Sequence, residues 1–160
     1  MVVSSLSPSE LIQRIGTAIS RWQDATARFD EAIGERLHLS TSERQCLALL
    51  TQGPHPARHI AEATRLTRAA ITTLVDRLEA RKLVRRTADK HDRRQVLISM
   101  TPMAERLTAQ YYGPIAAKGT RFLASFTHAE LTAILRFVEG ALELQLGEID
   151  ELARKTPPGP

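Results

Sequence analysis

The chain has 160 residues, of which 42% are hydrophobic and 25% charged, the composition of one ordinary globular domain. A chain of this length buries a core without disulfide bonds, and its single cysteine excludes an internal disulfide framework. We therefore expect a protein of the reducing cytoplasm. No apolar run approaches the roughly 18 residues of a membrane span, and no secretory signal pattern is present, so we expect no membrane partner.

The formal net charge of +4 is unevenly distributed along the chain. Residues 57–95 contain 11 basic and 5 acidic side chains, a charge of +6, so the remainder carries −2. A basic centre between mildly acidic ends indicates a middle module for a polyanion. A solvated surface of uneven charge is the alternative that charge alone leaves open.

Residues 1–36 are expected to form an N-terminal segment with one long helix, which runs to about Gly34. Ser7, Pro8 and Glu10 make a capping box with proline in the first turn, which predicts the helix start. Apolar residues then recur at alternating spacings of three and four, with Thr26 as the one polar interruption. They are Ile12, Ile15, Ile19, Trp22, Phe29 and Ile33. This spacing predicts a single apolar stripe along the helix.

The next segment predicts two short helices and then a more informative one. Capping residues start a helix at about Thr41, Gly53 and Pro54 break the chain, and a short helix follows over 57–64. Thr67 can cap a helix from Arg68 to about Lys82. Its predicted buried stripe is Ile71, Leu74, Val75 and Leu78. The opposite face holds Arg68, Ala69, Thr72, Thr73, Asp76 and Arg77. Small and polar side chains with arginine allow a helix to approach base edges closely.

Two short runs after this helix, 83–88 and 95–100, have the β-branched content of strands, and the segment 89–94 between them is charged and turn-prone. Helix, tight turn, helix and basic hairpin together predict a winged helix-turn-helix over residues 37–101. The predicted fold class is therefore mainly α with a small β-wing.

Residues 102–154 are expected to form two further helices, starting at Pro102 and after Thr127. The second of these helices has an apolar stripe. Residues 155–160, which contain three prolines, are expected to be disordered. Long first and last helices indicate N- and C-terminal dimerisation helices, so we expect a homodimer. Burial of both stripes within one chain is the competing interpretation.

From Leu39 to Leu107 the chain resembles the multiple-antibiotic-resistance regulator (MarR) family. The resemblance depends on the order and spacing of several motifs. They are Ser40–Glu43, Gly53-Pro54, Leu66–Glu79, Leu83-Val84 and, most specifically, the wing motif D-x-x-D-R-R at 89–94, followed by Leu97–Pro102. The flanking helices match in length and placement only. Lys82 departs from the family pattern, which usually has glycine there, and this puts the turn between helix and wing in question.

The resemblance implies a homodimeric transcriptional regulator of double-stranded DNA, commonly a repressor released by a small ligand or by oxidation. Five residues match the part of the recognition helix that meets the major groove: Thr67, Arg68, Ala69, Thr72 and Thr73. Arg77 matches a position that contacts phosphate or pairs with a wing aspartate. Arg93 and Arg94 match the wing-tip arginines at the minor groove, and Asp92 matches a residue that holds the tip in shape.

We expect the electrostatic attraction to phosphates to come mainly from the arginines of the wing tip together with Lys90, Arg85 and Arg86. The operator is expected to be pseudo-palindromic, with half-sites about one helical turn apart.

The resemblance also suggests a pocket for a small aromatic or anionic effector. Its candidate walls are Trp22, Phe29, His38, Tyr111 and Tyr112, and Arg21 or Arg28 could hold an anion. The alternative places Trp22 and Phe29 in the core of the dimer interface. Cys46 could sense oxidation, but its apolar surroundings favour a buried, inert thiol.

No cofactor, metal site or catalytic residue is predicted. The five histidines lack the spacing of a metal site, and the sequence contains no G-x-S-x-G motif and no glycine-rich phosphate loop, so we expect no enzymatic activity. Two alternatives to the DNA-binding regulator remain, a metal-sensing regulator and a protein-interaction adaptor that uses the winged-helix module.

Overall fold

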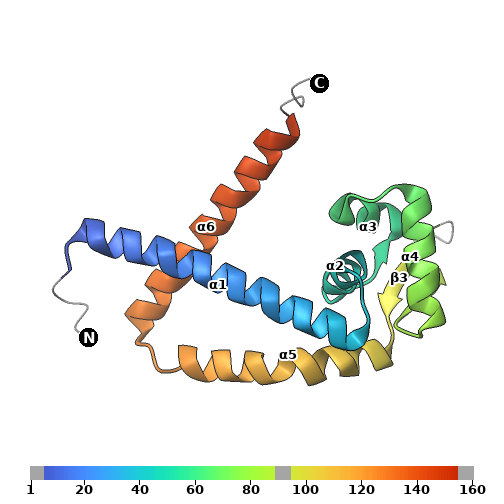
Figure 1. The fold of residues 1–160 in the computed structure, drawn as a ribbon, viewed down its shortest axis with the longest axis horizontal. Helices are drawn as coiled ribbons and strands as arrows, with labels where there is room; N and C mark the ends of the chain where they lie inside the picture. The colour runs from blue at the N-terminus through green and yellow to red at the C-terminus, as the bar shows by residue number, and fades with distance from the viewer. Residues whose placement is uncertain (1–5, 89–94, 155–160) are drawn as a thin grey trace. The chain divides into compact units, whose positions relative to one another are not determined.

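The computed structural model describes residues 6–88 and 95–154, which form long outer helices and a small winged module (Figure 1). The helices are α1 (Pro8–Leu37), α2 (Thr41–Leu50), α3 (Ala57–Thr64), α4 (Arg68–Ala80), α5 (Pro102–Leu123) and α6 (His128–Arg154). The strands are β1 (His55–Pro56), β2 (Val84–Ala88) and β3 (Val96–Met100). The predicted fold class, mainly α with a small β-wing, is confirmed.

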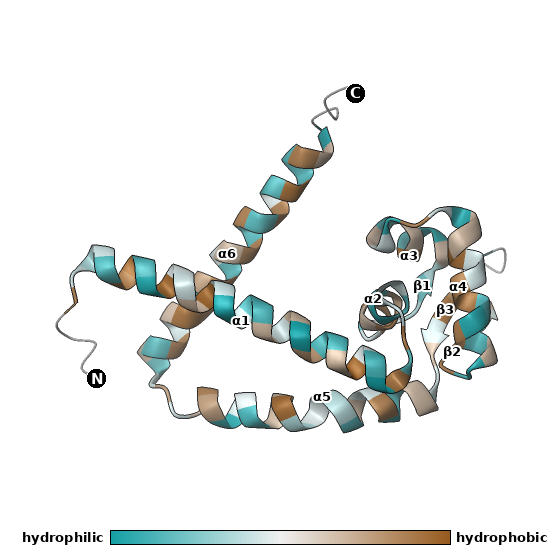
Figure 2. Ribbon diagram, in the orientation of Figure 1, coloured by the Kyte–Doolittle hydropathy of each residue, from teal (hydrophilic) through white to brown (hydrophobic). Residues whose placement is uncertain are grey.

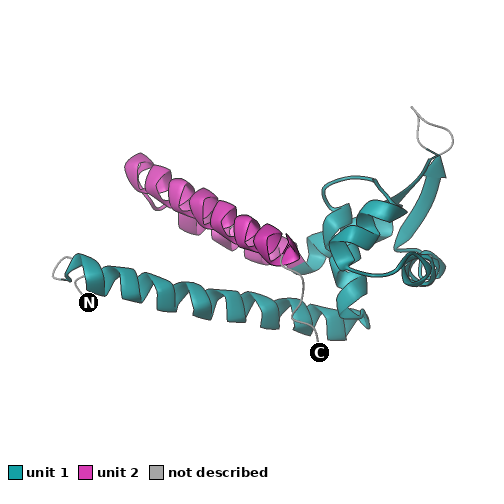
Figure 3. Cartoon of the chain, turned by 90° about the horizontal axis from the view of Figure 1, so that it is seen from above, with its two compact units in different colours: residues 1–111 teal, residues 112–160 magenta. Residues whose placement is uncertain are grey.

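The chain divides into two compact units, residues 1–111 and residues 112–160, which Figure 3 shows in different colours. The first unit contains α1, the winged module and the start of α5, and the second contains the rest of α5 and α6. Each unit is described by itself below.

Side-chain caps define the helix starts, as the sequence predicts. Capping boxes begin α1 at Ser7 and α2 at Ser40, because in each the serine hydroxyl accepts from a glutamate N–H at 3.3 Å. The same pairing at Thr127 begins α6, and Thr101 caps α5 by accepting from the Ala104 N–H at 3.2 Å. These caps satisfy backbone donors that have no partner inside the helix.

Three helices end in the same left-handed turn. The residues with positive φ are His38 at 50°, Arg65 at 54° and Lys82 at 58°, and each is followed by a leucine. The leucine N–H groups bond five residues back: Leu39 to Gly34, Leu66 to Ala61 and Leu83 to Leu78, at 2.8, 3.1 and 2.9 Å. This is the Schellman arrangement, and the three leucines pack on the core of the winged module. Lys82 thus keeps the turn for which the family pattern usually has glycine.

The sheet has the order β1-β3-β2 and is antiparallel throughout. β2 and β3 form the predicted hairpin, with Val84 opposite Met100 and Ala88 opposite Val96. β1 was not predicted, because the sequence shows only a break there; Pro56 is tolerated because β1 is an edge strand.

The core of the winged module lies between α2, α3, α4 and the sheet. Its largest fully buried side chains are Ile60, Ile71, Leu74, Leu78, Ile98, Val75, Val84 and Cys46. The predicted buried stripe of α4 is therefore confirmed, and the opposite face of α4 is exposed.

The three long helices, α1, α5 and α6, bury far fewer residues than the winged module does. All residues of α6 are described and none of them is buried, while α1 buries only Ile33 and Gly34. Apolar segments nevertheless recur along α1, α5 and α6 (Figure 2). Within residues 6–88 and 95–154, no helix is long and apolar enough to cross a membrane.

Candidate nucleic-acid interface

The N-terminal turn of α4 is exposed and capped. The Thr67 hydroxyl accepts from the Ala70 N–H at 3.3 Å, and Thr67, Arg68 and Ala69 are all exposed. The first N–H groups of a helix have no intrahelical acceptor and carry the positive end of its dipole. This turn therefore has the chemistry of an anion-binding site.

The exposed face of α4 consists of the predicted side chains. They are Arg68, Ala69, Thr72, Thr73, Asp76 and Arg77, and every one of them is exposed. The other face of the same helix is the buried stripe of the module core. Because its buried face is packed in the core, α4 presents its polar face in a fixed orientation within the module.

The two threonines of this face have their hydroxyl protons engaged. Thr72 Oγ1 donates to the Arg68 carbonyl at 3.1 Å, and Thr73 Oγ1 donates to the Ala69 carbonyl at 3.3 Å. Each threonine therefore presents oxygen lone pairs and a methyl group to its surroundings. These groups can accept from a base amino group or contact a thymine methyl.

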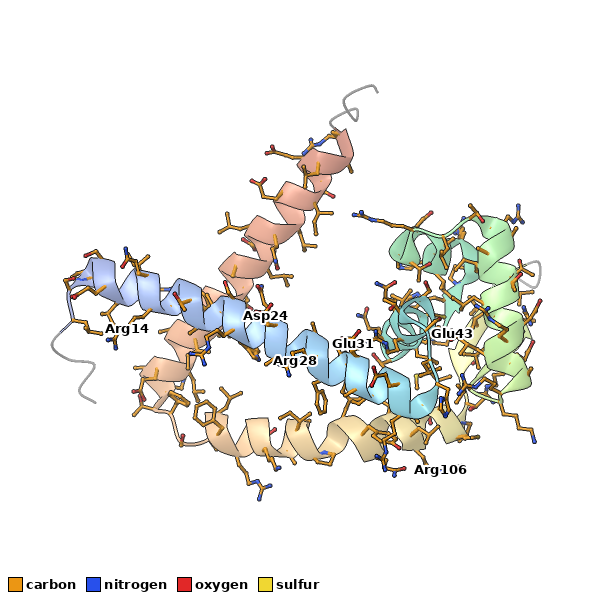
Figure 4. All side chains as sticks on the ribbon, in the orientation of Figure 1. Arg14, Asp24, Arg28, Glu31, Glu43 and Arg106 are labelled. Atoms are coloured by element: carbon orange, nitrogen blue, oxygen red, sulfur yellow. The ribbon has the colours of Figure 1, made fainter. Side chains whose placement is uncertain are left out.

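Arg77 connects α4 to the start of α2. Its Nε lies 3.5 Å from Oε1 of Glu43, a carboxylate whose side chain is only 8% exposed. Figure 4 labels Glu43 near the start of α2. The other oxygen of Glu43 accepts from the Ser40 N–H at 2.8 Å in the capping box of α2. The Arg77 side chain is 60% exposed, so its outer nitrogens remain accessible to an anion.

Arg86 differs from the expectation that it attracts phosphate. Its guanidinium lies 2.6 Å from Oδ1 of Asp76 and also bonds Glu79, whose carboxylate accepts the Arg86 backbone N–H at 3.2 Å. Two carboxylates therefore offset its charge. Arg86 fastens β2 to α4, whereas the neighbouring Arg85 bonds only the Ser99 hydroxyl, at 3.3 Å, among the described contacts.

The wing-tip residues Lys90, Asp92, Arg93 and Arg94 lie outside the described residues, as does the tail 155–160. β2 ends at Ala88 and β3 begins at Val96, so the paired strands lead directly into and out of this tip.

The candidate effector residues are spread along the chain. Trp22 and Phe29 are exposed on α1, and His38 is the left-handed residue that ends this helix. Trp22 and His38 are 16 residues apart, which at the helical rise is about 24 Å, so these two side chains do not line one small pocket within a chain. Tyr111 and Tyr112 fall on either side of the boundary between the units.

Cys46 lies in the core of the winged module and is fully buried. Burial raises the pKa of its thiol to about 12, with a smaller contribution from the nearby Glu43 carboxylate. A neutral thiol without solvent access is a poor nucleophile.

Metal-ligating residues do not gather in the part of the chain that the structure describes, where no three His, Cys, Asp or Glu side chains could hold an ion together. The rings of His55 and His59 stack with centroids 4.6 Å apart.

No pattern in the sequence indicates the contacts of Arg81. Its guanidinium donates to the Leu37 and His38 carbonyls at the end of α1. These residues are 44 and 43 positions apart from it in the chain, so no local spacing indicates the contact.

Comparison with known proteins gives a consistent family. Residues 37–95 match the sequence profile of the MarR family. The chain is 27% identical over 144 residues to YcgE of Bacillus subtilis, described as an uncharacterised helix-turn-helix-type transcriptional regulator, covering 89% of both chains. It is 29% identical over 96 residues to NicR of Pseudomonas putida, a helix-turn-helix-type transcriptional repressor, covering 59% of this chain and 61% of NicR.

Solved structures share the fold. The RV1404 protein of Mycobacterium tuberculosis superposes with a TM-score of 0.59 at 19% identity, over 88% of this chain and 95% of that one. YusO of Bacillus subtilis gives 0.58 at 22% identity, over 86% and 99%. The apo form of MarR from E. coli gives 0.54 at 16% identity, over 79% and 96%. The relatives are regulators and not enzymes, as the sequence predicts. Residues 37–95 therefore match the MarR family, and the chain as a whole resembles helix-turn-helix transcriptional regulators with a winged-helix fold.

Proposed function

We propose that this protein is a cytoplasmic, homodimeric transcriptional repressor that binds a pseudo-palindromic operator in double-stranded DNA. The observation that carries the proposal is the exposed polar face of α4, whose opposite face is anchored in the core of a MarR-family module. A fixed helix with this surface fits the major groove.

In this proposal the first turns of α4 read the DNA. Arg68 is exposed and its side chain bonds no partner among the described residues, so its two-pronged guanidinium is available for guanine. Thr72 and Thr73 offer acceptors and methyl groups to neighbouring bases. Thr67 and Ala69 belong to the helix N-terminus, where backbone N–H groups meet phosphate, and Arg77 adds a phosphate contact.

The wing contributes the second contact. Lys90, Arg93 and Arg94 are proposed to meet phosphates and the minor groove, with Asp92 shaping the tip. The contacts of Arg86 with Asp76 and Glu79 support this assignment, since they fix the base of the hairpin against α4.

Exposed apolar helices support the homodimer. Four large apolar side chains of α1 are more than a third exposed in the single chain: Ile12, Ile15, Trp22 and Phe29. Eight of α6 are too: Leu135, Phe137, Val138, Leu142, Leu144, Leu146, Ile149 and Leu152. Covering such surface stabilises an association by about 25 cal/mol per Å² of apolar area. A two-fold pair would present two copies of α4 to a two-fold operator.

The proposal also includes repression and control by a small effector. NicR, a relative, is named a repressor. The exposed aromatic rings Trp22 and Phe29, about 10 Å apart along α1, offer a surface for a small aromatic effector, and Arg21 or Arg28 offers a charge for an anionic one. Figure 4 labels Arg28 on this helix. The further candidates His38, Tyr111 and Tyr112 stay predictions.

A salt titration of DNA binding tests the proposal. Fluorescence anisotropy of a labelled duplex from upstream of the protein's own gene would be compared with an unrelated duplex of equal length. We expect tighter binding to the first, with a log-log salt slope of about −0.9 per phosphate neutralised. Equal affinity for both duplexes, or a slope near zero, would contradict the proposal.

A further inference from the structure

The three residues that follow the recognition helix attach it to two long helices. At the C-terminus of α4, the Arg81 guanidinium donates from Nη1 to the His38 carbonyl at 2.8 Å and from Nη2 to the Leu37 carbonyl at 2.6 Å. The last carbonyls of a helix lack intrahelical partners and carry the negative end of its dipole. The planar fork of an arginine matches two adjacent acceptors better than a lysine does.

The end of α1 is shaped to present these carbonyls. His38 has φ 50° and ψ 48°, and the Leu39 N–H bonds the Gly34 carbonyl at 2.8 Å. This closes the turn and leaves the Leu37 and His38 carbonyls for Arg81.

A second arginine packs on the same turn. Gly34 is buried, and a Cβ at this position would lie 2.6 Å from both Cδ and Nε of Arg44, which belongs to α2. The absence of a side chain at Gly34 therefore lets Arg44 lie against the α1 backbone. An arginine of α2 and an arginine at the end of α4 therefore both contact the last turn of α1.

The start of α5 bonds the two residues that follow Arg81. The Thr101 hydroxyl donates to the Lys82 carbonyl at 2.6 Å, and the Thr101 N–H donates to the Leu83 carbonyl at 3.1 Å. The same hydroxyl caps α5. Residues 81–83 therefore bond the end of α1 through Arg81 and the start of α5 through the carbonyls of Lys82 and Leu83.

We infer that Arg81 is a positioning residue, whose two bonds to the end of α1 fix the direction of α4 relative to α1. The consequence for DNA rests on the proposed function: in a dimer joined through α1, this direction sets the separation of the two recognition helices. A single half-site does not sense that separation, whereas a two-half-site operator does.

The first experiment does not depend on DNA. Spin labels are attached through Ala27→Cys on α1 and Thr72→Cys on α4, both exposed positions, while the buried Cys46 stays unlabelled. The labelled chain is diluted in an excess of unlabelled chain, so that only distances within one chain are seen. The distribution of distances between the two spin labels is then measured by pulsed electron paramagnetic resonance. We expect Arg81→Lys to broaden it and Arg58→Lys, a matched change on the exposed face of α3, to leave it unchanged.

The second experiment reads the consequence for DNA, using unlabelled protein and duplexes with one half-site or with two at native or altered spacing. We expect Arg81→Lys to lose about tenfold in affinity for the two-half-site duplex and to discriminate spacing less, with single-site affinity retained. Arg81→Gln serves as a second variant should the first unfold. If the distance distributions are unchanged in both variants, the inference is overturned whatever the DNA result. If the distributions broaden but the wild type shows no specific DNA binding, the positioning role of Arg81 is upheld and only the proposed function is overturned.

Discussion

Arg86 on β2 lies 2.6 Å from the Asp76 carboxylate on α4, so the strand that leads to the wing is bonded to the exposed face of α4. Its neighbour Arg85 bonds the Ser99 hydroxyl instead. Two adjacent arginines of one strand thus differ in their contacts, since Arg86 pairs with carboxylates of α4 and Arg85 bonds a hydroxyl of the neighbouring strand.

This difference predicts that two matched substitutions affect different properties, the stability of the fold in one case and the binding of DNA in the other. Arg86→Gln is expected to lower the free energy of unfolding by about 1 kcal/mol, because it removes a partly exposed pair with Asp76 and Glu79. Arg85→Gln is expected to change stability little but to reduce the salt slope of DNA binding by about 1. Urea unfolding and anisotropy check the two. Arg86→Gln with unchanged stability would mean that its ion pairs contribute nothing in solution.

Lys82 predicts a stabilising substitution. A residue with a side chain in the left-handed region costs about 1 kcal/mol relative to glycine, and Lys82 has φ 58°. Lys82→Gly should raise the free energy of unfolding by about that amount, measured by urea denaturation. Lys82→Ala is the control, since it removes the charge and keeps the Cβ; a gain as large as that of glycine would show that charge, and not backbone conformation, is responsible.

Gly34 predicts a destabilising substitution. In Gly34→Ala the new Cβ meets Arg44 at 2.6 Å, so the arginine must move from the last turn of α1. Compared with the same substitution at an open helical position, we expect a loss of about 1 kcal/mol or more in thermal or urea unfolding, because the gain in helix propensity is shared and only Gly34→Ala must displace Arg44. Gly147→Ala in α6 is the matched change, because nothing lies within 4 Å of a Cβ there; helix propensity predicts a gain of up to about 1 kcal/mol. Equal effects of the two substitutions would contradict the packing of Arg44 against Gly34.

Cys46 predicts an unreactive native thiol. Its pKa is raised to about 12, so at pH 8 the thiol is almost entirely protonated as well as buried. A thiol reagent at this pH should modify Cys46 only after urea unfolds the protein, and Cys46→Ala should retain DNA binding. Because the folded state holds this proton more tightly than the unfolded state, stability should fall as pH rises from about 9 towards 12. Rapid modification of the native protein would reopen the redox-sensor interpretation.

Trp22 is the single tryptophan and provides a direct reporter of dimerisation. Its side chain is 66% exposed in the single chain, so the homodimer proposal predicts that association covers it. Emission should shift to longer wavelength on dilution below the dissociation constant, in step with the mass measured by ultracentrifugation. Emission of an exposed tryptophan at concentrations where the protein is dimeric would place the interface elsewhere.

The sequence predicted those features that local periodicity and capping chemistry determine. The buried stripe of α4 follows from the spacing of Ile71, Leu74, Val75 and Leu78, and the capping boxes follow from short motifs. β1 was missed because a two-residue edge strand exists only through pairing with β3. The contacts of Arg81 and Arg86 were missed because they join residues that only the fold brings together.

Lys82 illustrates how tertiary packing overrides a local preference. The family pattern has glycine at this position, and a lysine there favours a different turn. The adjacent Leu83 is only 5% exposed in the module core, and the Thr101 hydroxyl holds the Lys82 carbonyl. These contacts favour the left-handed turn despite its steric cost.

The ratio of specific to non-specific DNA affinity shows most directly whether the exposed face of α4 reads DNA sequence. This ratio is measured by anisotropy for the wild type, Arg68→Ala and Arg136→Ala, the last being an equal charge change on exposed α6. We predict that Arg68→Ala lowers the ratio by an amount equivalent to about 1–3 kcal/mol and that Arg136→Ala leaves it unchanged. Equal ratios for all three proteins would contradict the assignment of α4 as the recognition helix.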